Sequence, residues 1–371
     1  MINKVTGLLR KVNYGELGIF YALIVFWLLL IVFDAPGFRD ISVYRSILQK
    51  ASFMGICGVG MTLVIASRHF DQSIGAMVAF LGCTFAILIR AFSDTPPQTE
   101  VGVVTRPDGV EFLGIPWYGI VLAILVVMLL SVGCGLLNGV LVAKLHIPAF
   151  IATLGTLYVF RGSAYLVSDS KPVIINEVVT RQQYAFFDFL GTGSIIGLSF
   201  SFWVMILCAI LGAVILRKMK LGRDTLAIGN SVEASRISGI NIDKTKILVF
   251  TLLGVFVGIA AILNTTFLAS SNPGMVQGFE FDVITTVVLG GTALAGGKGS
   301  IFNSIVAAIF LATITVSMPL IGIGSYPQRI ILGAILLFAF SINQIRVIGE
   351  NARVKANARR EARLKAALRN E

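Results

Sequence analysis

Apolar residues run along this chain in long blocks that are separated by short polar stretches. Most blocks hold about 17 residues or more, enough for an α-helix to cross a bilayer core of roughly 30 Å. The blocks are continuous rather than alternating, which disfavours the strands of a membrane barrel. The pattern therefore predicts an all-α, polytopic bundle with about ten membrane-spanning helices, near 17–36, 51–66, 71–92, 116–143, 147–168, 197–216, 246–269, 283–297, 300–320 and 327–346.

Two of these blocks are short and interrupted. The block 51–66 ends in the polar run 67–73, and the block 283–297 ends in the glycine-rich run 290–300. Short, glycine-interrupted apolar segments in two halves of a transporter are typical of broken helices beside a permeation path. We therefore expect broken or re-entrant segments at both places, and a weak internal repeat would explain their similarity.

Positive charges gather in the N-terminal tail, in the loop 217–246 and in the tail beyond Arg346. Because cytoplasmic loops carry an excess of Lys and Arg, both termini are predicted to be cytoplasmic. The chain then divides into a tail (1–16), a membrane domain (17–346) and a basic tail (347–371). The acidic loop 93–115 is then predicted to lie on the external side of the membrane. The basic cluster Arg39, Arg45 and Lys50 falls on the same side, which conflicts with the excess of positive charge expected in cytoplasmic loops.

Composition agrees with a membrane protein and excludes several other classes. The chain is 56% hydrophobic and only 13% charged, against about 25% charged in soluble domains. Its net charge of +11 lies in loops between spans, so we attribute it to membrane orientation and not to nucleic-acid binding. The basic tail could also lie near anionic lipid. The four cysteines lie in apolar blocks without a paired spacing, so no disulfide or metal site is indicated.

The glycine-rich run around Lys298 does not match a phosphate-binding loop. That motif needs a serine or threonine directly after the lysine and a glycine five positions before the last glycine. Gly299 follows Lys298, and Thr292 occupies the other position. ATP binding by this route is therefore excluded, and no bound cofactor is predicted for this chain.

Polar residues inside spans are costly and mark candidate functional positions. Those predicted to line a substrate pathway are Asp71, Gln72, Ser73, Asn138, Thr153, Thr156 and Asn264. Structural alternatives stay open: Asp71 could cap the helix that follows, worth about 1 kcal/mol. Interhelical hydrogen bonds of roughly 0.6–2 kcal/mol would account for the asparagine and threonines. Two further residues, Glu280 and Asp282, could contact an external partner or cap a helix. His69 and His146 are expected to be interfacial, with proton coupling as the alternative.

Several motifs in the same order resemble the permease subunits of ribose- and xylose-type sugar ABC importers. They include Gly135–Gly139, Ile147–Thr156 with Arg161-Gly162, Gly229–Asn241, Asn272–Asp282 and Val287–Ser300. The resemblance covers roughly residues 50–345. It departs from the family at Arg68 and His69, where glycines are usual, and at Gln72, where an apolar residue is usual.

The resemblance implies an importer in a bacterial inner membrane. A second copy of the chain would complete the pathway, a periplasmic binding protein would deliver the solute, and a separate ATPase subunit would use ATP and Mg. Its docking element would lie in the polar island Gly229–Asn241, through Gly229, Asn230, Glu233, Ala234, Ser235, Arg236, Ser238 and Gly239. In that reading Ile237 and Ile240 anchor the element. The chain itself would not be an enzyme.

Two other classes are less consistent with the residues. An ion-coupled secondary transporter would need carboxylates in the middle of several spans, and this chain has almost none there. A membrane enzyme would need a cluster of His, Asp or Cys side chains, and the sequence shows no such cluster.

Overall fold

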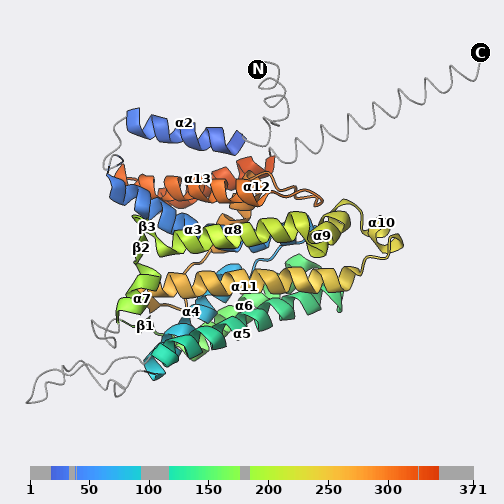
Figure 1. Ribbon diagram of the computed structural model, residues 1–371, viewed down its shortest axis with the longest axis horizontal. Coiled ribbons are helices and arrows are strands. Elements are labelled where there is room, and N and C mark those ends of the chain that lie inside the picture. The colour runs from blue at the N-terminus through green and yellow to red at the C-terminus, as the bar shows by residue number, and fades with distance from the viewer. Residues whose placement is uncertain are drawn as a thin grey trace, which may run out of the picture.

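The computed structural model describes residues 18–32, 38, 40–92, 117–175, 184–324 and 326–341. Long helices lie side by side along one axis of the molecule (Figure 1). In chain order, the described helices, long and short, are α2 (Gly18–Val32), α3 (Ile41–Ala66), α4 (Ile74–Ala91), α5 (Trp117–Ala143), α6 (Ala149–Val167), α7 (Tyr184–Gly191), α8 (Phe200–Lys218), α9 (Lys220–Asn230), α10 (Val232–Ile237), α11 (Ile242–Leu268), α12 (Phe279–Leu289), α13 (Ile301–Leu320) and a last helix, Tyr326–Ser341.

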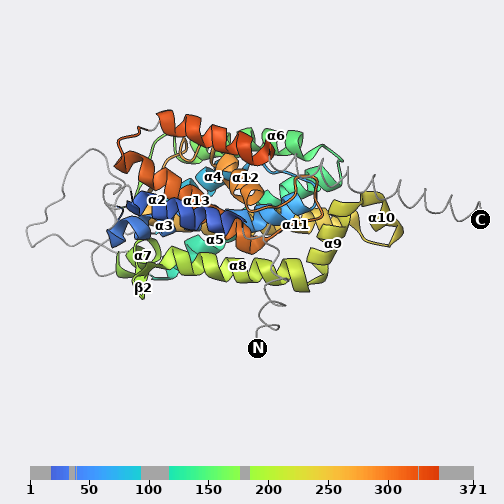
Figure 2. The same ribbon diagram turned by 90° about the horizontal axis from the view of Figure 1, so that it is seen from above.

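Four two-residue strands form two small antiparallel pairs. Strand β1 (Val173–Ile174) pairs with β4 (Ser270–Ser271), with Val173 opposite Ser271, and β2 (Ser194–Ile195) pairs with β3 (Leu198–Ser199). These strands and α7 lie at one end of the bundle, whereas α9 and α10 lie at the other (Figures 1 and 2). The two ends therefore differ in structure: hairpins at one, short polar helices at the other.

The predicted helical membrane bundle is confirmed. Seven described helices are long and apolar enough to cross a membrane: α3, α4, α5, α6, α8, α11 and α13. Shorter apolar helices are α2 and Tyr326–Ser341. Together with α12, each of the ten predicted blocks contains a helix. The tails 1–16 and 347–371 and the loop 93–115 lie outside the described residues.

The boundaries of both interrupted blocks differ from the prediction. The block 51–66 is not short, because α3 begins at Ile41, where the side chain of Asp40 accepts a hydrogen bond from Ser42 N at 2.9 Å. Polar residues between Ile41 and Lys50 lower the hydropathy of this part, so the apolar pattern did not predict it as helix. The block 283–297 does not form one helix, because α12 ends at Leu289 and Gly291 takes a left-handed φ of 86°. The chain from Gly290 to Ser300 is a loop.

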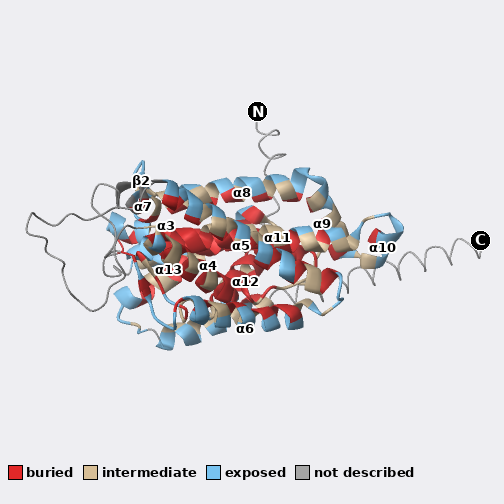
Figure 3. Ribbon diagram, turned by 90° about the horizontal axis from the view of Figure 1, so that it is seen from below, coloured by how far each residue is buried: buried red, intermediate tan, exposed pale blue. Residues whose placement is uncertain are grey.

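Helix α3 lies inside the bundle, and α6 and α8 lie along its edges, where much of the ribbon is coloured as exposed (Figure 3). The most apolar window of α3 is 89% buried, against 28% for those of α6 and α8. Helix α5 packs closely on α11 through small residues. A Cβ on Gly135 would lie 2.5 Å from Phe250 O, and one on Gly254 would lie 2.4 Å from Ser131 O. Glycines allow this backbone approach, a common device between membrane helices.

Candidate functional site

The polar island that sequence analysis singled out forms a corner of two short helices. Helix α9 ends at Asn230, and Ser231 caps α10 by accepting a hydrogen bond from Ala234 N at 3.2 Å. Asn241 then caps α11 by accepting from Lys244 N at 2.9 Å. Each cap satisfies a backbone donor at a helix start. The corner is therefore a fixed structure and not an open loop.

Glu233, Ala234, Arg236, Ser238 and Gly239 are exposed on this corner. Two predictions made for it are wrong. Ile237 does not anchor the helix, because it is 81% exposed. Ser235 is not available to a docking partner, because it is buried and donates to Ser231 O at 2.8 Å. Ile237, the last residue of α10, is therefore an exposed apolar side chain next to Arg236 in the sequence.

Gly229 joins the corner to both interrupted segments. A Cβ at this position would lie 2.0 Å from Ala66 O, at the end of α3, and 2.2 Å from Gly297 N, in the loop after α12. Gly297 N donates to Ala66 O at 2.9 Å. Three chain segments that are distant in sequence therefore meet here at backbone distance, and only glycine fits at position 229.

The side chain of Arg68 holds the same junction. Its Nε donates to Gly229 O at 2.6 Å and to Ala295 O at 2.7 Å, and its Nη2 donates to Asn230 O at 3.0 Å. Arg68 has a left-handed φ of 68°, a conformation that favours glycine. Sequence analysis treated Arg68 only as a departure from the family pattern. We name the contact of Ala66, Arg68, Gly229, Asn230 and Ala295–Gly297 the backbone junction.

A second group of predicted residues forms a buried hydrogen-bond network. One carboxyl oxygen of Asp71 accepts from Ser73 N (2.7 Å) and Ser73 Oγ (2.6 Å). The other accepts from Asn138 Nδ2 at 2.9 Å, and Asn138 Nδ2 also donates to Ser73 Oγ at 2.9 Å. All three residues are buried. The network ties the start of α4 to α5, as the interhelical alternative predicted.

Thr153 on α6 joins this region through the backbone. Its hydroxyl oxygen accepts from Gln72 N at 3.1 Å, and the hydroxyl donates to Ala149 O at 2.8 Å. Thr156 lies one turn further along and donates to Thr153 O at 3.3 Å. Gln72 thus contributes its backbone here. The structure brings six of the seven predicted pathway residues into one region where α4, α5 and α6 meet.

The starts of α4 and α12 face each other. A Cβ on Gly75 would lie 2.5 Å from Glu280 Oε2 and 2.7 Å from Val276 O. Arg161 on α6 fixes the turn before α12 by donating from Nη1 to Pro273 O (2.7 Å) and Met275 O (2.8 Å). Two helix starts therefore converge inside the bundle, as in the broken helices of many transporters.

This arrangement changes the interpretation of Glu280. The side chain is buried against α4, so it does not offer the surface contact for a binding protein that the sequence predicted. Asp282 is partly exposed and lies within electrostatic reach of Lys50 on α3. Both acidic residues occupy the first turn of α12, where a negative charge interacts favourably with the helix dipole.

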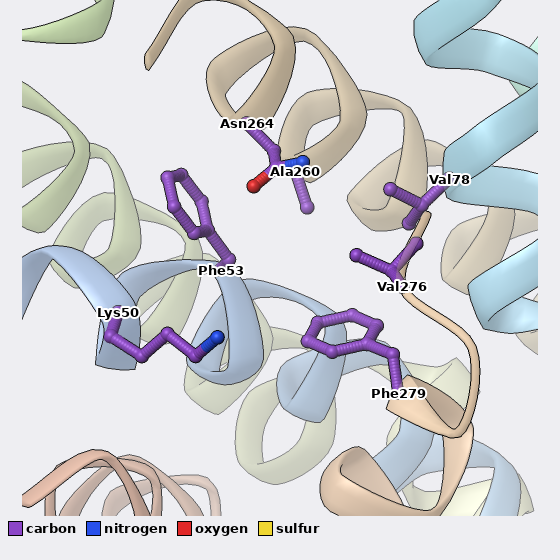
Figure 4. Close-up of a pocket in the computed structure, with 7 residues that line it drawn as sticks. All are labelled: Lys50, Phe53, Val78, Ala260, Asn264, Val276 and Phe279. Carbon is purple, nitrogen blue, oxygen red and sulfur yellow. The ribbon is translucent and has the colours of Figure 1, made fainter. Parts of the chain in front are cut away.

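Asn264, the seventh pathway residue, lies apart from the others and lines a cavity of about 30 Å³ (Figure 4). Its Nδ2 has no hydrogen-bond partner in the described part of the chain. The other lining residues are Lys50, Phe53, Val78, Ala260, Val276 and Phe279. In the sequence, Lys50 stood out only as part of the basic cluster before the predicted block 51–66, and the two phenylalanines were not selected because aromatic residues are common in apolar blocks. Among the described residues, no group of His, Cys, Asp and Glu could hold a metal ion.

Comparison with known proteins decides the family. The model of the family described as "Branched-chain amino acid transport system / permease component" matches residues 43–340. The chain belongs to this family. It is a multi-pass membrane permease component and not an enzyme in its own right. The matched region contains both interrupted segments, the backbone junction and the Asn264 cavity.

Relatives with more specific names share about a third of the sequence. The chain is 32% identical to the ribose import permease protein of Escherichia coli (strain K12), over 83% of this chain and 88% of that protein. It is 34% identical to a probable ABC transporter permease protein of the same organism, over 90% of each chain. The L-arabinose transport system permease protein of that strain is 32% identical over 88% of this chain and 89% of its own length. No solved structure matches the chain.

Proposed function

We propose that this chain is the membrane subunit of an ABC importer for a sugar, with a binding protein delivering the solute and a separate ATPase subunit hydrolysing ATP with Mg. The observation that carries the proposal is the backbone junction. A docked ATPase can drive transport only if the movement of its docking element also moves the segments that form the pathway. Here the end of α9 accepts hydrogen bonds from Arg68 in the first interrupted segment, and Gly229 lies at backbone distance from Gly297 in the second.

The ATPase is proposed to dock on the exposed face of the corner, through Glu233, Arg236 and Ser238, with Ile237 as the apolar contact. Protein interfaces combine an apolar centre with a polar rim, and Ile237 among these polar residues fits that composition. Gly239, with a left-handed φ of 76°, sets the turn that leads into α11. Asn230 contributes through its carbonyl oxygen to the backbone junction.

Sugar is the proposed solute because the relatives named for a solute, ribose and arabinose, match along most of their length. The family description names branched-chain amino acids instead. The remaining assembly is proposed on the same basis: a second copy of the chain completes the pathway in a bacterial inner membrane, with the α10 end in the cytoplasm.

The test of docking is ATP hydrolysis and uptake by the reconstituted importer. We expect Arg236→Glu to lower sugar-stimulated ATP hydrolysis at least tenfold, because the reversed charge meets the docked subunit. The matched control is Lys171→Glu, an exposed cation at the opposite end of the bundle, which should leave hydrolysis within twofold of the wild type. Equal rates in the two variants would refute the docking assignment.

The solute class is tested separately with the wild-type importer. Proteoliposomes that hold the permease, the ATPase and the binding protein are offered labelled D-ribose, L-arabinose and L-leucine. ATP-dependent uptake of a sugar is the expected result. Uptake of leucine alone would replace sugar by amino acid, and uptake by the chain without an ATPase would exclude the importer.

A further inference from the structure

Asn264 presents an unpaired amide at a place where a membrane helix normally has none. The residue is on α11 and is 9% exposed. Its Nδ2 has no partner among the described residues, and leaving a buried donor unpaired costs about 1–3 kcal/mol. Figure 4 shows the amide directed at the cavity. A donor kept unpaired beside a cavity is available to a ligand.

The surroundings of the amide suit a molecule with hydroxyl groups and C–H faces. Phe53 and Phe279 place two aromatic rings on the cavity wall, and the ammonium of Lys50 approaches it from α3 (Figure 4). Apolar walls with a few placed polar groups are the usual composition of small-molecule sites. Asn264 and Lys50 can donate hydrogen bonds to hydroxyl oxygens, and the rings can stack against the C–H face of a carbohydrate.

Lys50 also indicates what lies outside the cavity. It is exposed although it belongs to α3, a helix that crosses the membrane. A lysine at the centre of a membrane helix costs about 2.5–3.5 kcal/mol, and a lysine nearer the helix end avoids this cost by reaching water. The partly exposed Asp282 lies within its electrostatic reach. This charged side of the molecule therefore fits water or another protein surface better than lipid.

The size of the cavity limits what it holds in this conformation. Its volume is about 30 Å³, and a water molecule needs roughly 10–15 Å³ of such space. About two waters fit, so in this conformation the cavity admits one hydroxyl-bearing edge of a sugar, and a whole ring can stack on Phe53 or Phe279 only after the cavity widens. Phe279 is the first residue of α12, so movement of this short helix relative to α3 would change the opening.

We propose that the cavity between α3, α4, α11 and α12 is a contact site for the transported polyhydroxylated solute, with Asn264 as hydrogen-bond donor and Phe53 and Phe279 as stacking surfaces. The proposal rests on the proposed function. Within it, the site names side chains that meet the solute inside the membrane. The open side with Lys50 and Asp282 lines the aqueous pathway.

The test compares two unpaired polar residues that are neighbours in sequence. Asn264→Leu removes the donor from the cavity. Thr265→Val is the matched control, because Thr265 Oγ1 is likewise buried without a partner among the residues that the structure describes but lies toward Gly82 on α4. Both changes remove an unpaired buried group, so both variants should melt in detergent at or above the wild-type temperature.

Uptake by the complete importer distinguishes the two variants. We expect Asn264→Leu to lower the initial rate of D-ribose or L-arabinose uptake at least tenfold, and Thr265→Val to change it less than twofold. Phe53→Leu, which keeps an apolar side chain but removes a ring, should raise the ATP hydrolysed per sugar delivered at least threefold. Normal uptake by Asn264→Leu, or equal losses in the two neighbours, would overturn the proposal. A wild-type importer that carries neither sugar would instead refute the proposed function.

Discussion

At the scale of single residues, polar groups in this bundle fall into two kinds. The Asp71 carboxylate, the Ser73 hydroxyl and the Asn138 Nδ2 group bond to one another, whereas Asn264 Nδ2 and Asn138 Oδ1 have no partner among the described residues. All four were predicted to line a substrate pathway, because the sequence shows only that each is polar within an apolar block. They differ in which residues the fold brings next to them. Asn138, which donates to Asp71, is 67 residues away in the sequence. Such pairing depends on the tertiary fold, which one sequence does not provide.

The buried network should be sensitive to a change that keeps the shape of Asp71. In Asp71→Asn, one acceptor oxygen becomes an NH₂ group, and it then faces either Ser73 N or Asn138 Nδ2, which are donors. A buried donor without an acceptor costs about 1–3 kcal/mol, so the melting temperature in detergent should fall. Gln72→Ala is the control, because the bond that Gln72 makes to Thr153 uses its backbone. A loss of stability confined to Gln72→Ala would contradict this account.

Arg68 shows how a departure from a family pattern can carry a role. In sequence it was a bulky residue where glycine is usual. In the structure it adopts the left-handed backbone that glycine would supply, at a cost of roughly 1–2 kcal/mol. Its three hydrogen bonds to carbonyl oxygens offset this cost. The residue type was visible in the sequence, but its acceptors at positions 229, 230 and 295 were not.

At the scale of elements, the apolar blocks predicted the helices and the two interrupted places, but not where the helices begin and end. The existence of a helix depends on its own residues, which are printed in the sequence. The end of α12 at Leu289 and the separation of α9 from α10 depend on glycines and on the Ser231 cap. The start of α3 at Ile41 was hidden because polar residues in a buried, central helix lower its apparent hydropathy.

The contact between α5 and α11 gives an element-scale prediction with a control on the same helix. Gly135→Ala should destabilise the protein by about 1–3 kcal/mol, because its methyl group would overlap Phe250 O. Gly133→Ala, two residues earlier, meets nothing within 4 Å and should be neutral or slightly stabilising. Thermal unfolding of the two variants in detergent measures the difference. Equal melting temperatures would mean that the two helices do not pack as described.

At the scale of the whole molecule, the two ends of the bundle should be reached from opposite sides of the membrane. The four native cysteines are buried, so an introduced cysteine can be labelled against a low background. We expect a membrane-impermeant maleimide to label Ile196→Cys, at a position 88% exposed beside β2 and β3, in intact spheroplasts. Ser238→Cys, beside α10, should react only after permeabilisation. The reverse pattern would invert the proposed orientation.

The backbone junction has a consequence for how this protein can diversify. Arg68 binds carbonyl oxygens, and every residue type carries one. Side chains at Asn230 and Ala295 can therefore change without removing the acceptors of the guanidinium. Gly229 has no such freedom, since any Cβ there collides with Ala66 O and Gly297 N. Tolerance of mutations in this corner should therefore depend on space rather than on side-chain chemistry. The surface proposed to meet an ATPase can change together with that partner, while Gly229 beneath it stays fixed.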